Sequence, residues 1–521
     1  MPDDLRAYVE KLLAVRGLPG LSLAVTDREG IIASEAFGYA DLAAGTPVTP
    51  ETRFEVGSIG KTFTAVALLQ LHEEGLLDPN QPVGRYLPWF QVRSEHEPIA
   101  VHHLATHTAG IVTGDALSSD SRFDVWALRE TETGFPPGAY FHYSNVGFRA
   151  LGYVVEELTG KPYAQVLRER ILDPLGLRAT DPALTSETRK RLAVGHERWY
   201  GDRPPPRADP WVPAPWVETG TGDGSLAAPA DDLAGFLRAL LNGGRDVLAA
   251  ESFGLMATPV AECGDGWSYG YGLEVREIDG RREIRHGGSM PGFGSTMLGD
   301  LAAGLGVAVL VNGEDDGDLT GEVAAAALDH YRGGATPPPV ADPLAVESGS
   351  EYEGTFVGDD RRLAVRAEGG RLFLAGDDRS ALEPRGEDRF LVDHPDFALF
   401  LLGFRRKDGA VVEAVHGGDV YVREGTPRRP APKPPDELRA YAGHYRAYNP
   451  WLPSFRVVLR GDELVVAWPW GSEEPLTPLS SGSFRVGEES WSPERVRFDA
   501  IVDGQALWAS LSGCGEYYRL P

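Results

Sequence analysis

Alternating apolar and polar residues predict a hairpin near the start of the chain and further strands towards residue 300. The stretch LSLAVTDREGIIASEAFGYAD, residues 21–41, alternates on both sides of a turn at DREG, and residues 269–288 and 304–315 also have strand patterns. Mostly apolar segments that end in glycine predict helices over 61–75, 145–160 and 230–244. Strands at both ends with helices between them predict an α+β fold. Its antiparallel sheet is flanked by helices, with the first and last strands as neighbours.

The remainder of the chain reads as two copies of one small β unit. Connectors rich in proline and glycine at 332–343 and 424–437 divide the chain into 1–335, 345–424 and 436–521. The segments LEPRGEDRF and LTPLSSGSF place Leu, Pro and Phe at the same spacing in the two tail pieces. Short strands joined by tight turns, without a helix pattern, predict two small up-and-down β-barrels. Such barrels can be packing modules without chemistry of their own.

Charge and composition exclude several classes of partner. The 521-residue chain has a net charge of -27, which disfavours nucleic acids and anionic membrane surfaces as partners. The first twenty residues form an acidic amphipathic pattern rather than a signal peptide, and no apolar run is long enough to span a membrane, so a cytoplasmic location is expected. The two cysteines, Cys263 and Cys514, match no metal motif, and neither a metal nor a cofactor is expected.

The stretch FEVGSIGKTFTAVALLQL, residues 54–71, permits two interpretations. A phosphate-binding loop ending in Gly-Lys-Thr requires a glycine where this chain has Glu55, whose carboxylate would repel phosphate. The alternative is a nucleophilic Ser58 with Lys61 one helical turn later, so that both side chains face one cleft. A serine at the start of a helix is commonly only a cap, and a lysine one turn later commonly only solvated. Of the six lysines, however, only Lys61 follows a serine by three residues.

A second group that can handle protons is Tyr143, in the segment FPPGAYFHYSNVGF. A tyrosine near an ammonium can move a proton from a nucleophile to a leaving group. Asn145 lies two residues later, directly at the start of a predicted helix. The structural alternative is a turn in which Tyr143 packs and Asn145 caps the helix.

The third element is the segment REIRHGGSMPGFGS, which we expect to form an edge strand that holds the substrate backbone. Gly287 and Gly288 would let a substrate lie close to the strand, and the backbone N–H of Ser289 could join that of Ser58 in an oxyanion hole. The structural alternative is a glycine-rich turn with a surface histidine, His286.

These three motifs together resemble the serine beta-lactamase and penicillin-binding-protein superfamily, in its class C, esterase and D-aminopeptidase-like branch (peptidase family S12 type). The resemblance covers about residues 5 to 335 and implies a beta-lactamase/transpeptidase-like fold, followed by two lipocalin-like barrels. It implies that Ser58 is the nucleophile, Lys61 its proton partner, Tyr143 the second base or acid, and Asn145 a substrate ligand. His286 stands in place of the usual lysine, and no metal is implied.

The resemblance implies a serine hydrolase that acts on a small molecule or short peptide. A D-aminopeptidase-like or small-peptide peptidase is the leading hypothesis; an esterase, a weak class C-like beta-lactamase and a catalytically silent penicillin-binding sensor are the alternatives. Histidine is mostly neutral at pH 7, so His286 is a poor partner for the carboxylate of a penicillin. A homodimer remains an alternative to a monomer.

An aminopeptidase also needs an anion to bind the substrate's ammonium group. In the D-aminopeptidase type, a loop of the last barrel reaches the active site. The segment SFRVGEESWSPE is the candidate loop here, with Glu488 and Glu489 as substrate-binding residues close to Trp491. The alternative is a solvated turn whose glutamates face water.

Overall fold

A computed structural model describes residues 1–114, 121–314, 318–375, 379–427 and 435–521. Within them the first part of the chain forms one antiparallel sheet in the order β3-β2-β1-β13-β12-β11-β10-β9-β8. Its strands are β1 (Gly20–Thr26), β2 (Ile31–Asp41), β3 (Thr46–Pro47), β8 (Ala261–Gly264), β9 (Trp267–Tyr269), β10 (Glu274–Ile278), β11 (Arg281–Met290), β12 (Phe293–Asp300) and β13 (Leu305–Val311). The hairpin and the pairing of the first strand with the last are confirmed, since Leu21 lies opposite Val311.

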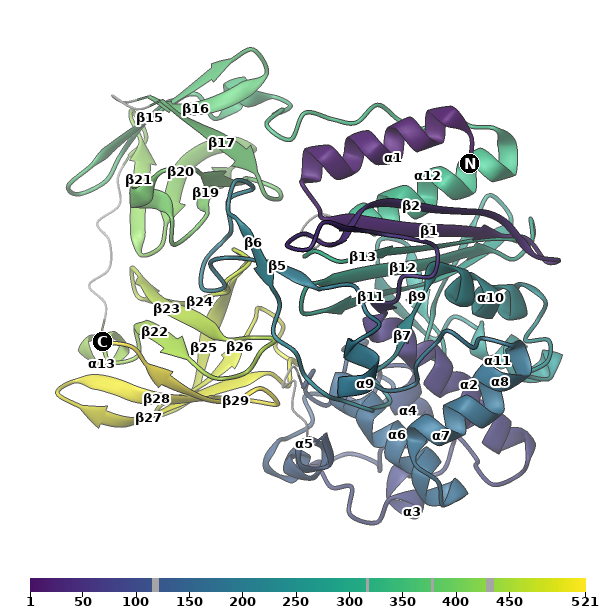
Figure 1. Cartoon of the computed structure of the whole chain (residues 1–521). Helices are drawn as coiled ribbons and strands as arrows, with labels where there is room; N and C mark the ends of the chain where they lie inside the picture. Colours follow the sequence, from purple (N-terminus) through teal and green to yellow (C-terminus); the bar gives the residue numbers. More distant parts are fainter. Residues whose placement is uncertain (115–120, 315–317, 376–378, 428–434) are drawn as a thin grey trace.

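Helices cover both faces of this sheet, as Figure 1 shows. Helices α1 and α12 pack on one face and α10 on the other, because alternate residues of β1 and β13 point to opposite sides. The helices predicted at 61–75, 145–160 and 230–244 correspond to α2, α6 and α10. The helices of this part are α1 (Asp3–Arg16), α2 (Gly60–Glu73), α3 (Val83–Tyr86), α4 (Val101–Ala105), α5 (Ser121–Ala127), α6 (Asn145–Thr159), α7 (Tyr163–Leu167), α8 (Asp173–Leu175), α9 (Ser186–Arg189), α10 (Ala230–Leu241), α11 (Ala250–Met256) and α12 (Leu319–Gly333).

The prediction that the glycine-rich segment around Gly287 forms an edge strand is wrong. β11 is an inner strand, paired with β12 on one side and β10 on the other. β10 begins only at Glu274, opposite Arg285, so the segment from His286 to Met290 has partners in β12 alone among the described residues. The chain before β10 turns away, and the N–H of Gly272 donates to the carbonyl of Ala105 in α4. One backbone edge of the glycine-rich segment is thereby left without a neighbouring strand.

Two closed barrels of eight strands each follow, as the repeat predicts, and they lie one beside the other along the first domain (Figure 1). The hairpin turns Asp408-Gly409 and Asp503-Gly504 have the same backbone form, with φ values of 51° and 82° and of 49° and 74°. The first barrel contains β14 (Gly354–Val357), β15 (Arg362–Glu368), β16 (Arg371–Ala375), β17 (Ser380–Pro384), β18 (Arg389–Val392), β19 (Leu402–Lys407), β20 (Ala410–His416) and β21 (Asp419–Arg423). The second contains β22 (Gly443–Arg446), β23 (Ser454–Arg460), β24 (Glu463–Ala467), β25 (Glu473–Ser480), β26 (Ser483–Val486), β27 (Arg495–Val502), β28 (Gln505–Leu511) and β29 (Gly515–Arg519), after a short helix α13 (Asp436–Arg439).

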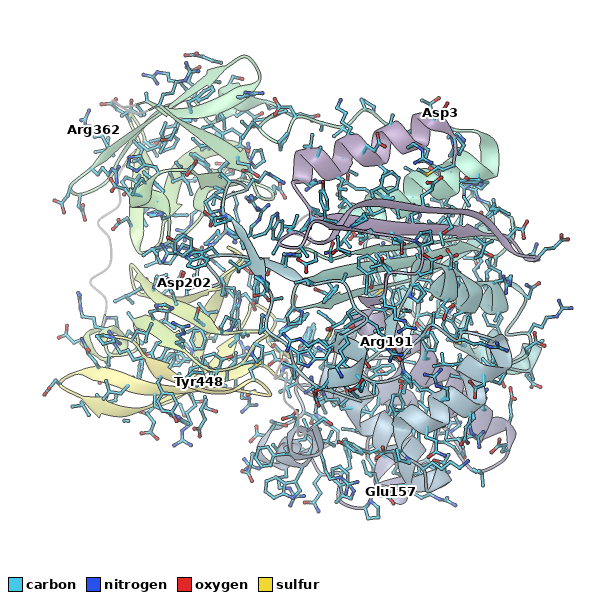
Figure 2. All side chains as sticks on the ribbon, in the orientation of Figure 1. Asp3, Glu157, Arg191, Asp202, Arg362 and Tyr448 are labelled. Carbon is cyan, nitrogen blue, oxygen red and sulfur yellow. The ribbon has the colours of Figure 1, made fainter. Side chains whose placement is uncertain are left out.

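A long segment of the first domain, between β5 (His196–Arg198) and β6 (Trp211–Pro213), contacts both barrels. These two strands form a two-stranded ladder; a second small ladder joins β4 (Phe54–Glu55) to β7 (Ala227–Ala228). Asp202 lies where this segment meets the second barrel, as Figure 2 shows, and pairs with Arg456 at 2.9 Å. Arg207 pairs with Glu383 of the first barrel. Part of the predicted connector at 424–437, residues 428–434, lies outside the described residues.

None of the described helices combines the length and the apolar character needed to cross a membrane.

Candidate active site

Ser58 lies in a 3₁₀ turn, Gly57–Ile59, that leads directly into α2. Lys61 follows in the first turn of that helix, and its side chain is fully buried. Its Nζ atom donates to Ser58 Oγ at 2.9 Å, to Asn145 Oδ1 at 2.8 Å and to the backbone carbonyl of Asp223 at 2.7 Å. The structure therefore joins Ser58, Lys61 and Asn145 in one hydrogen-bonded cluster.

The two carbonyl acceptors give the Lys61 amine a direction. An ammonium has three protons and can donate to all three partners. A neutral amine has two protons, which the oxygens of Asn145 and Asp223 would retain because neither oxygen carries a proton to give. The lone pair of the neutral amine would then point at Ser58 Oγ. Both charge states of Lys61 thus fit the same geometry. A group that accepts a proton and later returns it must be able to adopt both states.

Glycines let the Gly57–Ile59 turn and β11 touch through their backbones. Gly57 has a φ of 51°, and a Cβ atom there would lie 2.6 Å from the backbone nitrogen of Ser289. A Cβ on Gly288 would lie 2.0 Å from the carbonyl of Val56 and 3.0 Å from the nitrogen of Ser58. This contact brings the backbone nitrogens of Ser58 and Ser289 into one region, where an oxyanion hole is expected.

Tyr143 stands next to the Lys61 ammonium. Lys61 Nζ lies 4.9 Å from the centroid of the Tyr143 ring, and that ring packs on His107 with ring centroids 4.1 Å apart. His107 Nδ1 accepts the N–H of Ser144, and Ser144, rather than Asn145, caps α6 by accepting the N–H of Gly147. Burial, and then Lys61, hold the pKa of His107 well below its usual value. His107 is therefore a neutral support for the Tyr143–Asn145 segment.

His286 is buried and uncharged. Burial, and then the Lys61 ammonium, lower its pKa to about 3. Its Nδ1 lies 2.6 Å from the carbonyl of Gly287, which can only accept, so Nδ1 carries the proton and Nε2 accepts the hydroxyl of Tyr269 at 2.8 Å. The structure thus places a neutral group where the resemblance expects a lysine.

Two cavities meet at Ser58, and Ser58, Tyr143 and Ser289 line both of them. The cavity of about 360 Å³ follows β11 and is also lined by Glu274, His286, Gly287, Gly288, Gly294, Ser295, Thr296, Asp318 and Thr320. The cavity of about 240 Å³ follows the segment 219–225 and is also lined by Gly57, Thr113, Asn145, Arg149, Thr219, Thr221, Asp223, Gly224, Ser225, Met290 and Trp451. A substrate that spans both cavities would have its central bond at Ser58.

The second barrel reaches the site, but not through the predicted glutamates. Glu488 and Glu489 are exposed and line neither cavity. Five residues after Glu489, Glu494 Oε1 accepts the N–H of Thr113 at 2.6 Å and lies 3.0 Å from Nε2 of His142. The Glu494 carboxylate therefore binds the segments next to Tyr143 and does not line either cavity.

Aromatic contacts fix the same loop. Trp491 stacks on Tyr140 with ring centroids 4.9 Å apart and an interplanar angle of 6°, and it meets Phe135 edge-on. Arg495 pairs with Glu132 at 2.9 Å. The barrel residue that does line a cavity is Trp451, from the β22–β23 connection, which the sequence analysis did not single out.

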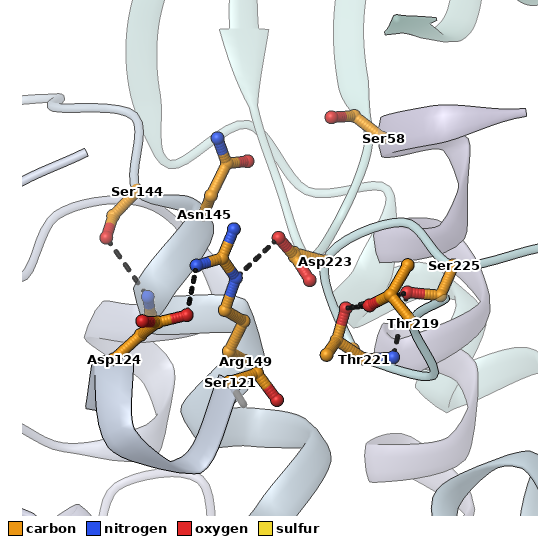
Figure 3. A network of polar contacts seen from close by, with 12 residues as sticks. Ser58, Ser121, Asp124, Ser144, Asn145, Arg149, Thr219, Thr221, Asp223 and Ser225 are labelled. Carbon is orange, nitrogen blue, oxygen red and sulfur yellow. Dashed lines mark hydrogen bonds and ion pairs between the residues drawn. The ribbon is translucent and has the colours of Figure 1, made fainter. Parts of the chain in front are cut away.

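Behind the site lies a buried ion-pair network that the sequence analysis also missed (Figure 3). Arg149, one turn after Asn145 in α6, donates from Nε to Asp223 Oδ2 at 2.9 Å and from Nη1 to Asp124 Oδ2 at 3.0 Å. A single arginine in the otherwise apolar segment NVGFRALGYVV was the available signal, since a buried charge needs a partner.

Comparison with known proteins assigns the domain that contains this cluster to a family. A family model described as Beta-lactamase matches residues 5–331. Penicillin-binding protein 4 of Amycolatopsis lactamdurans is 31% identical over 334 residues, which are 60% of this chain and 86% of that protein.

Two solved structures resemble about four fifths of this chain in fold. The octameric penicillin-binding protein homologue from Pyrococcus abyssi has a TM-score of 0.60 at 24% identity, over 80% of this chain and 99% of its own. SurE, in a crystal structure with D-Leu, has a TM-score of 0.50 at 25% identity, over 81% of this chain and 99% of its own. The family match spans the whole sheet-and-helix domain that holds Ser58, Lys61, Tyr143 and β11. The chain therefore belongs to the beta-lactamase family of serine hydrolases, with two β-barrels added behind the family domain.

Proposed function

We propose that the protein cleaves an amide bond of a small peptide by way of a covalent acyl-enzyme on Ser58, and that the acyl part of the substrate carries a D-amino acid. The observation that carries the proposal is the orientation of the Lys61 amine, which two fixed carbonyl acceptors aim at Ser58 Oγ. SurE, which was crystallised with D-Leu, supports the choice of a D-amino acid.

The reaction would proceed in two steps. Ser58 Oγ attacks the carbonyl carbon while its proton passes to Lys61 or Tyr143, and the N–H groups of Ser58 and Ser289 stabilise the oxyanion. The carbon–nitrogen bond then breaks, and the leaving amine takes the proton. Water attacks the resulting ester, loses its proton to the same pair of groups and releases the acid and Ser58.

The open edge of β11 supports a peptide as substrate. From His286 to Met290 this strand is paired with another strand on one side only among the described residues, so an extended substrate can lie along its open edge and bond to its backbone. Backbone bonding of this kind favours peptides over esters of small alcohols. An esterase remains the second candidate, since the neutral His286 imposes no charge requirement.

The charges of the larger cavity argue against a dedicated beta-lactamase. Among the described residues that line it, the ionisable groups include the carboxylates of Glu274 and Asp318 but no lysine or arginine. A penicillin carboxylate placed along β11 would meet the neutral His286 and these acids. We therefore expect slow acylation by penicillins.

A labelling and substrate panel tests the proposal. We expect intact-mass spectra to show one adduct on Ser58 after treatment with a fluorophosphonate, and little adduct after treatment with benzylpenicillin. D-amino-acid p-nitroanilides should be cleaved faster than their L-enantiomers and than p-nitrophenyl esters relative to the uncatalysed rates. Absence of labelling at Ser58 would favour the silent sensor, and a preference for esters would favour the esterase.

The barrel contact yields a separate prediction. Replacing Glu494 with alanine removes the acceptor that holds the N–H of Thr113 and the ring of His142, on either side of the Tyr143 segment. We expect the rate of Ser58 labelling to fall by about 10-fold to 100-fold, because small displacements of catalytic groups have effects of that size.

Glu488→Ala and Glu489→Ala serve as matched controls, since both residues lie exposed on the same loop. Labelling rates by stopped-flow fluorescence, with melting temperatures for each variant, provide the measurement. A larger loss from Glu488→Ala than from Glu494→Ala would show that the exposed glutamates, and not the buried contact, matter.

A further inference from the structure

Arg149 connects the helix that presents Asn145 to the loop that presents Asp223. Because it follows Asn145 by four residues in α6, both side chains lie on the same face of the helix. Only 5% of the Arg149 side chain is exposed, and it lies between Asp124 and Asp223, as Figure 3 shows. A buried guanidinium with two carboxylate partners holds a fixed position.

The Asp223 loop is pressed against the nucleophile turn. A Cβ on Gly222 would lie 2.4 Å from the carbonyl of Phe148, and one on Gly224 would lie 2.8 Å from the backbone carbon of Gly57. These approaches place the Asp223 carbonyl 2.7 Å from Lys61 Nζ, while the Asp223 carboxylate accepts from Arg149. One residue therefore bonds to both buried cations, with its backbone oxygen to one and its side chain to the other.

The contacts close into a ring. Lys61 bonds to Asn145, Asn145 and Arg149 share α6, Arg149 bonds to Asp223, and the Asp223 carbonyl returns to Lys61. Two cations, Lys61 and Arg149, are matched by two carboxylates, Asp223 and Asp124. Without this balance, two neighbouring positive charges would be buried together, at a high cost in free energy.

We infer that Arg149 and Asp223 are positioning residues that aim the Lys61 amine at Ser58 and, by their opposite charges, set the pH range in which Lys61 exchanges its proton. This inference rests on the proposed function, in which Lys61 is the proton partner of Ser58. It assigns to the pair a charge effect that a purely structural ion pair would not have.

Among the charged groups around Lys61, the Asp223 carboxylate is the one that we expect to affect the proton exchange of Lys61 most. Burial by itself would raise the pKa of Asp223, but Arg149 and then Lys61 lower it, so that the carboxylate is ionised. Other groups near Lys61 are the phenol of Tyr143 and two histidines, His107 and His286, whose pKa values lie far below neutrality. Near pH 7 both histidines are thus neutral, which leaves Asp223, Arg149 and Asp124 as the charges behind Lys61.

The test measures the titration midpoint of Lys61 in two variants of opposite sign. Asp223→Asn removes a negative charge and should move the midpoint to lower pH by about one unit. Arg149→Gln removes a positive charge and should move it to higher pH, whereas Arg149→Lys keeps the charge and should stay near the wild type. Glu473→Gln, which breaks the buried pair with Arg460 in the second barrel, is the matched control and should change nothing.

Two readouts separate this inference from the proposed function. The first is an NMR titration of lysine ¹³Cε groups, which is practicable because the chain has only six lysines and Lys61→Arg assigns the signal. The second is the pH profile of the rate at which a fluorophosphonate labels Ser58. In that reaction the Oγ–phosphorus bond forms, fluoride leaves, and the serine proton passes to the enzyme.

Midpoints that move in opposite directions in both readouts would support the inference. Midpoints that stay in place, or that move in the same direction in Asp223→Asn and Arg149→Gln, would overturn it and leave the pair a structural one. A wild-type protein without label on Ser58 would defeat the proposed function, while the NMR titration would still decide the charge effect. Should Asp223→Asn fail to fold, the comparison of Arg149→Gln with Arg149→Lys decides the question.

Discussion

Replacing Ser58 with alanine is expected to abolish fluorophosphonate labelling and to lower peptide turnover by at least about 10⁴-fold, as removal of the nucleophile does in other serine hydrolases. The fold should remain intact, because Ser58 Oγ lies in the turn before α2 and the Lys61 amine would still bond to the oxygens of Asn145 and Asp223. Intact-mass spectrometry and melting curves measure the two effects separately.

The mutant also identifies any competing nucleophile. If a Ser58→Ala protein still acquired the label, peptide mapping would locate the modified residue, and the assignment of Ser58 would be wrong. If the label disappeared but turnover persisted, the hydrolysis would not proceed through an acyl-enzyme at this site.

Replacing Lys61 with methionine is expected to have the second large effect, on both the labelling rate and the stability. Methionine has a similar length and can fill the buried space, but it cannot accept a proton from Ser58. We expect the labelling rate to fall by about 10²-fold to 10⁴-fold, the usual contribution of a general base. Stability should also fall by roughly 1 to 3 kcal/mol for each carbonyl, of Asn145 and Asp223, that is left buried without its donor.

Lys190→Met is the matched control, since Lys190 is exposed and pairs with the nearby Glu187 in a surface contact. It should match the wild type in both rate and melting temperature. A Lys61→Met protein that labelled as fast as the wild type would contradict the scheme, and Tyr143 would then have to act without Lys61.

Features that depend on neighbouring residues could be predicted from the sequence. Ser58 and Lys61 are one helical turn apart, and the Asp-Gly pairs of the barrels demand a backbone form that few other residues adopt. The alternation around DREG likewise determines a hairpin. In each case the physical cause lies within a few residues of the chain.

Features that depend on distant segments could not be predicted. The Asp223 carbonyl is 162 residues from Lys61, and Glu494 is 381 residues from Thr113. Nothing in the alternation of residues 483–486 tells which glutamate of the following loop will face another domain. The loop turns between Glu489 and Ser492, where the N–H of Ser492 donates to the carbonyl of Glu489, and this turn directs Glu494 inward. The inner position of β11 was likewise hidden, because it depends on where β10 begins.

The bond from Glu494 to Thr113 has a consequence for how such proteins can be recombined. A chimaera that joined the first 335 residues to the barrels of a relative would keep this bond only if the relative's loop supplied an acceptor at the same place, even if each part folded well. The loop at 487–495 and the segment at 132–142 form a matched pair and must be exchanged together. The useful crossover points for engineering new specificities therefore lie outside both segments. Trp451, the other part of the second barrel described at the site, lines the smaller cavity together with Thr113, so its replacement would also act close to this contact.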